Sequence, residues 1–177
     1  MNYFILSQDS RVVAPRIKYE DMKKYSNAIH FTYQLAKAMQ PMNIFQVTAD
    51  ELTDFTDILS EQLFLVSADM GKLFQLYDPD LKLKTAVMFN RKFGHHTYKI
   101  PLLREVDCMS EKTEFYPDNR TIKHLMLDGE KIKKRKLFKV KDKDIVIIRM
   151  DVAESILRRY FTGIQLEHVA ITETADV

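Results

Sequence analysis

Two stretches of the chain present the same order of signals: a short apolar run, a helix-capping residue, a helical stripe and a strand-like alternation. In the first stretch, the apolar run at residues 63–66 ends at Ser67, whose hydroxyl can accept a hydrogen bond from the first turn of a helix. Residues 81–89 later begin with apolar and lysine residues in alternation, which predicts a strand. The stripe between them keeps the i, i+3, i+4, i+7 spacing of one helix face: Met70, Leu73, Phe74 and Tyr77.

The second stretch repeats this order 83 positions further along the chain. Residues 145–148 form the apolar run, and Asp151 with Glu154 matches a D-x-x-E capping box. Gly163 then predicts a stop, and residues 164–167 alternate again. The stripe has the same spacing as the first: Ala153, Ile156, Leu157 and Tyr160. The chain therefore holds two similar strand–cap–helix–strand units.

Further strand signals surround these units. Residues 3–6 are apolar, residues 98–102 alternate, and residues 122–127 lead into Asp128-Gly129, a favoured two-residue hairpin turn. Residues 21–39 fit a helical stripe and a strand equally, so their conformation stays open. Because strands outnumber the short helices, we expect an α+β fold with a mixed or mainly antiparallel sheet.

The length and the cysteine content limit the domain number and the compartment. A chain of 177 residues has the usual size of one domain, so we expect a single domain over residues 1–177. Cys108 is the only cysteine, which excludes an intramolecular disulfide and is typical of a reducing compartment. Residues 3–6 are too short for the core of an export signal, and no apolar run approaches the roughly 18 residues of a membrane span. We therefore expect a cytoplasmic protein that does not enter a membrane.

Few residue patterns point to catalysis or to metal binding. His95-His96 follows Gly94 and is expected in an exposed turn, since adjacent histidines on a strand point in opposite directions and do not converge on one ion. Cys108 lacks a nucleophile motif and is expected to pack as a small apolar side chain. The four glycines are too dispersed for a phosphate-binding loop. We expect a non-enzymatic protein without a metal ion or a cofactor.

An acidic run over residues 50–61 is the candidate partner-binding segment. It contains no basic residue, and its carboxylates can present a negative surface that speeds the encounter with a basic partner. A solvated loop or strand face is the alternative interpretation. The candidate residues are Asp50, Glu51, Asp54, Asp57 and Glu61.

A basic run over residues 131–143 suggests a different partner, because its eight cations can bind nucleic-acid phosphates. The alternative is an edge strand that points Phe138 and Val140 inward and is guarded by Lys139 and Lys141 on the outside. Phe138 is the only aromatic residue in the run, which is few for base stacking. The edge strand is therefore favoured, and nucleic-acid binding is the second hypothesis for function.

Several segments resemble a bacterial family that was first catalogued as a domain of unknown function and then grouped among the immunity proteins of polymorphic toxin systems. The resemblance is carried by residues 1–6, 65–67 and above all 136–166, which include the segment Asp151-Val152-Ala153-Glu154-Ser155-Ile156-Leu157-Arg158-Arg159. It implies a small cytoplasmic protein that binds a cognate toxin domain and blocks it. It transfers no catalytic residue and no ligand site.

Overall fold

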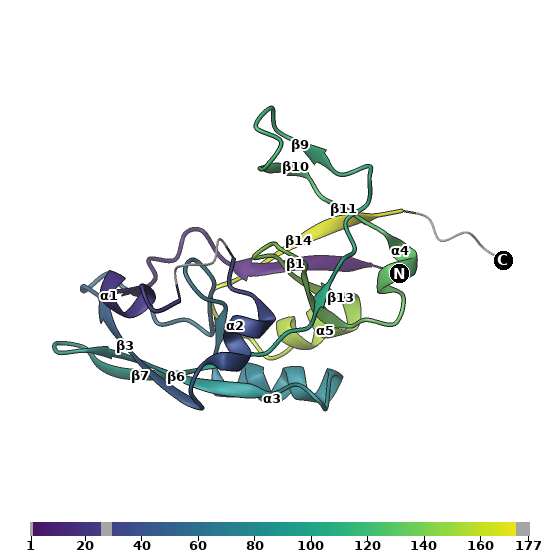
Figure 1. Ribbon diagram of the computed structural model, residues 1–177. Coiled ribbons are helices and arrows are strands. Elements are labelled where there is room, and N and C mark those ends of the chain that lie inside the picture. The colour runs from purple at the N-terminus through teal and green to yellow at the C-terminus, as the bar shows by residue number, and fades with distance from the viewer. Residues whose placement is uncertain (1, 26–29, 173–177) are drawn as a thin grey trace.

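The computed structural model of the protein (Figure 1) describes residues 2–25 and 30–172. In these ranges, two six-stranded sheets and one hairpin contain all the strands. The N-terminal sheet has the order β2 (Arg16–Ile17), β3 (Met42–Thr48), β6 (Leu83–Asn90), β7 (Gly94–Pro101), β5 (Leu65–Val66) and β4 (Ile58–Leu59). The C-terminal sheet has the order β11 (Met126–Leu127), β14 (Ile164–Ile171), β1 (Tyr3–Gln8), β13 (Val146–Arg149), β12 (Leu137–Val140) and β8 (Glu105–Val106). The hairpin of β9 (Glu114–Phe115) and β10 (Ile122–His124) projects from the C-terminal half.

The helices of the described chain are short, and the longest has ten residues. None of them has the length and apolar character that crossing a bilayer demands. Most strand pairs are antiparallel, but β3 with β6, β12 with β8 and β11 with β14 are parallel. The predicted α+β fold with mixed sheets is thus confirmed. The helices are α1 (Tyr19–Met22), α2 (Tyr33–Ala38), α3 (Ala68–Tyr77), α4 (Gly129–Ile132) and α5 (Met150–Leu157).

Helix α3 forms as its sequence predicts. The Ser67 hydroxyl accepts a hydrogen bond from the Met70 N–H at 3.3 Å, which satisfies one of the free donors of the first turn. Met70, Leu73 and Phe74 are buried on the predicted face. Tyr77 ends the helix, and its hydroxyl lies 2.5 Å from Ser155 Oγ on α5. The stripe therefore packs α3 against the second helix as well as against the sheets.

Helix α5 begins earlier than predicted. Arg149 is its N-cap residue, and the expected capping box of Asp151 is wrong, because Arg149 binds that carboxylate through two hydrogen bonds of 2.8 and 2.6 Å. The earlier start moves the buried face to Val152, Ala153 and Ile156. The last two members of the predicted stripe, Leu157 and Tyr160, are consequently exposed.

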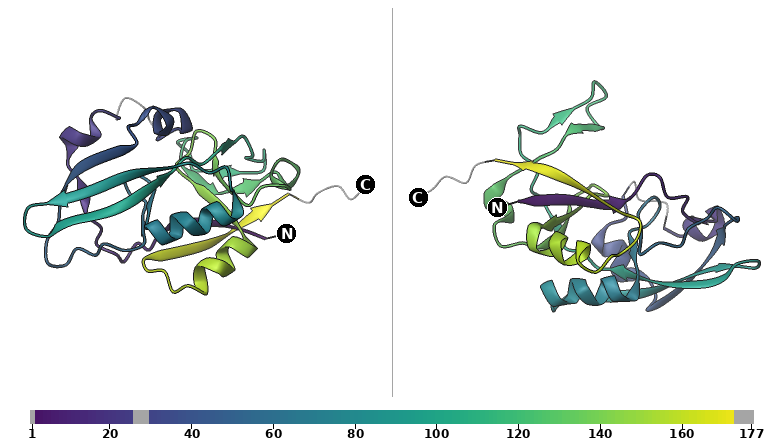
Figure 2. Two further views of the ribbon diagram at one scale, coloured as in Figure 1. Left: turned by 90° about the horizontal axis from the view of Figure 1, so that it is seen from below. Right: turned by 180° about the vertical axis from the view of Figure 1, so that it is seen from behind.

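The two sequence units become two related structural units. Strand β7 lies between β5 and β6, and β1 lies between β13 and β14, each antiparallel to both neighbours. Each unit is thus a strand–helix–strand segment whose two strands are separated by a third strand. Helices α3 and α5 lie side by side below the two sheets (Figures 1 and 2). One apolar core contains residues of both helices and both sheets, including Leu6, Val66, Phe74 and Ile156.

A second contact joins the two halves where residues 56–57 meet residues 162–163. The Asp57 carboxylate accepts hydrogen bonds from the Thr162 N–H and hydroxyl, at 2.8 and 2.9 Å. Gly163 has a φ of +71°, and a Cβ placed on it would overlap the Thr56 side chain. Only a residue without a side chain fits this approach.

Two local predictions are wrong, and part of residues 21–39, whose conformation the sequence leaves open, is described. Asp128 is not in a hairpin turn but is the N-cap residue of α4, where its carboxylate accepts the Glu130 N–H at 3.0 Å. His95 and His96 lie on strand β7, and the His96 ring stacks on Phe55 with ring centroids 3.7 Å apart. Of residues 21–39, the described part holds the end of α1 and all of α2, and residues 26–29 lie outside the described ranges.

We expect Gly163→Ala to destabilise the fold by about 2–4 kcal/mol, since the new methyl group combines the cost of a positive φ with the overlap at Thr56. Gly94→Ala is the matched control, because Gly94 also has a positive φ, +80°, but a Cβ there meets nothing within 4 Å. That variant should lose only about 1–2 kcal/mol in urea unfolding. Equal losses for the two variants would contradict the close contact.

Candidate functional site

Cys108 is not placed for chemistry. Its side chain is fully buried in the core of the C-terminal sheet beside Leu127 and Phe138. Burial and the nearby Asp107 carboxylate raise the pKa of the thiol to about 11, so the thiol is protonated at neutral pH. The expectation that it packs as a small apolar side chain is confirmed. Residues 2–25 and 30–172 also contain no group of three or more His, Cys, Asp or Glu residues close enough to hold a metal ion.

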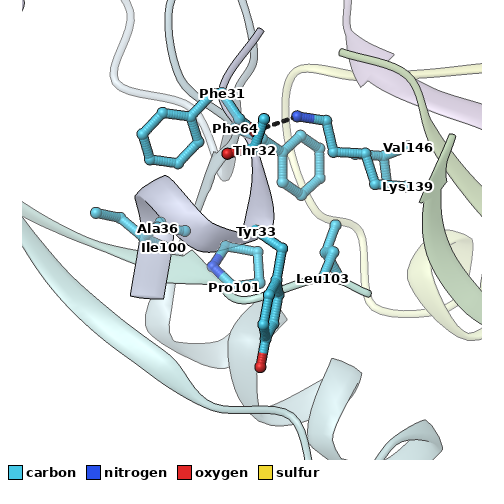
Figure 3. A pocket seen from close by; sticks show the side chains of 10 residues that line it. All are labelled: Phe31, Thr32, Tyr33, Ala36, Phe64, Ile100, Pro101, Leu103, Lys139 and Val146. Atoms are coloured by element: carbon cyan, nitrogen blue, oxygen red, sulfur yellow. Dashed lines mark hydrogen bonds between the residues drawn. The ribbon is translucent and has the colours of Figure 1, made fainter. Parts of the chain in front are cut away.

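A cleft between the two halves is closed by residues 31–36, as Figure 3 shows. Phe31 and Ala36 lie on one side of it, and Phe64, Leu103 and Val146 lie on the other. Its volume is about 30 Å³, and a neighbouring hollow beside Glu61 and Asp144 has about 100 Å³. Known ligand pockets measure roughly 300–1,000 Å³. The cleft therefore joins parts of the fold and does not offer room for an organic ligand.

Lys139 is the polar centre of this cleft. Its ammonium group donates hydrogen bonds to the Phe31 carbonyl and, at 2.6 Å, to the Asp144 carboxylate. Burial raises the pKa of Asp144, but the hydrogen bonds and charge of Lys139, with a contact from His30, outweigh it and lower the pKa. The predicted outward, edge-strand position of Lys139 is wrong, because β8 pairs with β12 and leaves Lys139 only 8% exposed.

In the structure, the five candidate acidic residues do not form one surface cluster with one role but have different partners. Asp57 holds Thr162, and Asp50 accepts the Leu52 N–H and the Thr53 hydroxyl in a surface turn. Glu51 forms an exposed ion pair with Lys92 at 3.0 Å, and Glu61 lies 3.9 Å from Arg16. Asp54 is exposed. The hypothesis that these residues meet a partner stays a prediction, but two of the five carboxylates are engaged in the fold itself.

The basic run is also divided. Its first four cations are exposed on and after α4, whereas Lys136 lies over the ring of Tyr77 and Lys139 is buried. The exposed ones are Lys131, Lys133, Lys134, Arg135 and, later in the run, Lys141. Nucleic-acid binding through this run is therefore a hypothesis that depends mainly on the exposed cations and not on all eight.

An open apolar face of the N-terminal sheet was not predicted. Strands β3, β6 and β7 pair over their central length, and their register places nine side chains on one face in three rows. We call this set the open face. The rows are Met42, Thr85 and Lys99; Ile44, Val87 and Thr97; and Gln46, Phe89 and His95.

The apolar members of the open face lie in contact with solvent. Met42 is 62% exposed, Ile44 is 66% exposed and Phe89 is 41% exposed. The opposite face of the same strands is covered, because Met22, Tyr25 and Phe31 pack on its core residues. In Figure 1, α1 and α2 lie on that covered side and α3 lies on the side of the open face.

Helix α3 packs on the same side of the N-terminal sheet as the open face, but it covers only one end of that face. Gly71 lies against Leu83 and Lys99, so a Cβ at Gly71 would be 3.0 Å from Leu83 Cδ1. The β6–β7 hairpin extends beyond the helix, as Figure 2 shows. The open face thus combines exposed apolar side chains with polar ones on paired strands, an arrangement that suits contact with another protein more than a small ligand.

Comparison of the chain with protein-family models and with curated proteins finds no match.

We expect Asp144→Asn to lower the melting temperature at pH 7, because an amide replaces the charged acceptor of the buried Lys139 ammonium. The unfolded pKa of an aspartate is about 3.9, and the folded pKa of Asp144 is lower, so its stabilisation is present above about pH 4 and is lost as the pH falls through the folded pKa. In thermal melts, the gap between wild type and variant should be constant near neutral pH and shrink below about pH 4.

The matched control is Asp142→Asn, two positions away. Asp142 is exposed and has a φ of +56°, a conformation that asparagine also tolerates. This change should alter the stability by less than about 0.5 kcal/mol. If both variants lose the same stability with the same pH profile, the Lys139–Asp144 pair does not hold residues 30–38 in place.

Proposed function

We propose that the protein is a non-catalytic binding protein, an immunity protein that neutralises a cognate toxin domain by covering it. The observation that carries the proposal is the open face, where Met42, Ile44 and Phe89 are exposed on paired strands. Contiguous exposed apolar side chains of this kind mark protein-interaction sites in other proteins. The resemblance of residues 136–166 to toxin-immunity proteins supports the choice of partner.

The open face has the energetics of an interface centre. Full burial of an apolar side chain such as Met42, Ile44 or Phe89 contributes about 1.5–3 kcal/mol. A standard interface covers about 800 Å² on each partner. Because this area extends beyond the apolar rows of the open face, those rows would form the centre and polar contacts would form the rim. Thr97 and His95 on β7 and Gln46 on β3 supply polar groups beside the apolar ones.

The rigidity of the strands supports tight binding. Strand β6 is paired along the open face with β3 on one side and β7 on the other. On the reverse side, Phe45, Ala86 and Met88 are buried in the sheet's own core. A partner therefore meets a preorganised surface and does not have to order it, which reduces the entropic cost of binding.

Inhibition by this mechanism needs no chemistry from the immunity protein. A bound protein of this size prevents access to an active site when its interface overlaps or borders that site. The resembling segment lies away from the open face. Residues 136–166 form β12, β13, α5 and the start of β14, which belong to the scaffold and not to the proposed binding surface.

We expect the double variant Met42→Gln/Ile44→Gln to lose protection in cells that co-express the toxin encoded beside its gene. The loss of apolar contact should weaken binding to that toxin domain by about 2 kcal/mol or more, roughly 30-fold, in calorimetric titration. The fold should persist, because both side chains are exposed in the free protein.

The control variant Leu76→Gln/Leu157→Gln removes two equally exposed apolar side chains from α3 and α5, where Leu76 is 71% and Leu157 is 61% exposed. It should protect cells as the wild type does. Cell death in the presence of the wild-type protein would count against the immunity function. Full protection by the Met42→Gln/Ile44→Gln variant would exclude the open face as the contact.

A further inference from the structure

A basic hollow adjoins the open face at the ends of β3 and β6. It has a volume of about 630 Å³ and is lined by residues that include Lys18, Gln46, Phe89, Asn90, Arg91 and Lys92. Gln46 and Phe89 belong to the open face and to the hollow, so the two surfaces are continuous. Among the described residues, the lining of the hollow contains three cations and no carboxylate.

The charges in the hollow are only partly compensated. Lys92 pairs with Glu51 at 3.0 Å, and its ammonium group also lies 5.2 Å from the Phe93 ring centroid. Lys18 donates a hydrogen bond to the neutral Gln46 side chain at 3.3 Å. Within residues 2–25 and 30–172, no carboxylate lies within ion-pair distance of Lys18 or Arg91.

Asp21, on helix α1 just after Lys18, bonds to other groups. Asp21 accepts the Gln46 N–H at 2.7 Å and lies 3.9 Å from the Lys24 ammonium group. Its carboxylate therefore has two partners, the Gln46 backbone and Lys24, that are neither Lys18 nor Arg91. Two cations, Lys18 and Arg91, are left facing a concave surface next to apolar side chains.

The turn that presents Arg91 and Lys92 is held in one conformation. The Asn90 side chain accepts the N–H groups of Lys92 and Phe93, at 2.8 and 3.2 Å, and donates to the Val47 carbonyl at 2.9 Å. These bonds fix the turn to the neighbouring strand β3. The hollow is therefore present before any partner arrives, and binding it costs little ordering.

From this continuity we infer that the hollow receives carboxylate side chains of a partner protein while the open face takes up apolar side chains of the same partner. The inference rests on the proposed function and specifies the chemistry of the contact. A protein surface can combine both kinds of group. A nucleic acid is the poorer fit, because it needs aromatic side chains for stacking, and Phe89 is the only aromatic residue among the described residues that line the hollow.

Selection from a random peptide library displayed on phage, with the full chain as bait, tests the inference without a known partner. We expect the enriched peptides to combine Asp or Glu residues with apolar residues. The dissociation constant of a synthetic enriched peptide should rise about tenfold for the variant Lys18→Glu/Arg91→Glu at about 50 mM salt, and less at higher salt, because screening weakens exposed charge contacts.

Two controls separate a specific contact from a general charge effect. Lys133→Glu/Lys134→Glu changes the net charge equally at exposed positions of the basic run and should shift the dissociation constant less than about twofold. A peptide whose Asp and Glu residues are replaced by Lys should bind Lys18→Glu/Arg91→Glu better than it binds wild type. This reversal cannot arise from a misfolded variant.

The outcomes distinguish this inference from the proposed function. Neutral or basic enriched peptides, no enrichment, or binding that is indifferent to the charges at Lys18 and Arg91 would overturn the inference, even if the protein neutralises its toxin. Acidic, apolar peptides that depend on the hollow would support it, even if co-expression with the toxin fails.

Discussion

The pairing of β1 with two strands from the other end of the chain holds the C-terminal sheet together. Strand β1 bonds to β13 along Tyr3–Leu6 and to β14 along Tyr3–Gln8, so these two strands are joined through it within the sheet. The Tyr3 side chain extends this contact, since its hydroxyl lies 2.8 Å from the Ile132 carbonyl. The shared core and the packing of α3 on α5 depend on this sheet. The open face depends on the C-terminal sheet indirectly. That sheet and α5 hold α3 in place, and the position of α3 decides which end of the N-terminal sheet is covered.

Local chemistry explains which parts of the fold were predictable. Ser67 and the stripe after it specify α3 by contacts within a few residues, and the structure agrees. Asp128 was misjudged, because an aspartate before a glycine suits a hairpin turn and a helix N-cap equally well. Lys139 was misjudged for a different reason. Its burial results from pairing with β8, more than thirty residues earlier, and no spacing in the sequence reports that contact.

The candidate site was less predictable than the fold. Residues 42–48 carry apolar side chains on both faces, with Met42 and Ile44 on one and Phe45 and Val47 on the other. Such a strand is usually covered on both sides. One face is exposed because α3 covers only one end of it. The length and position of α3 relative to the sheet are set by tertiary packing and cannot be read from the strand sequence. The acidic run was visible in the sequence, but the use of Asp57 at the junction with Thr162 was not, because 105 positions separate them.

The central position of β1 also affects the order in which the protein can be made and folded. A ribosome makes β1 long before either neighbour of this strand, since both neighbours lie beyond residue 145. Until residues 146–149 have been synthesised, the apolar side chains of Phe4 and Leu6 have no partner strand. The nascent chain thus carries β1 as an unpaired, aggregation-prone strand while residues 9–145 are synthesised, which makes β1 a natural binding segment for chaperones.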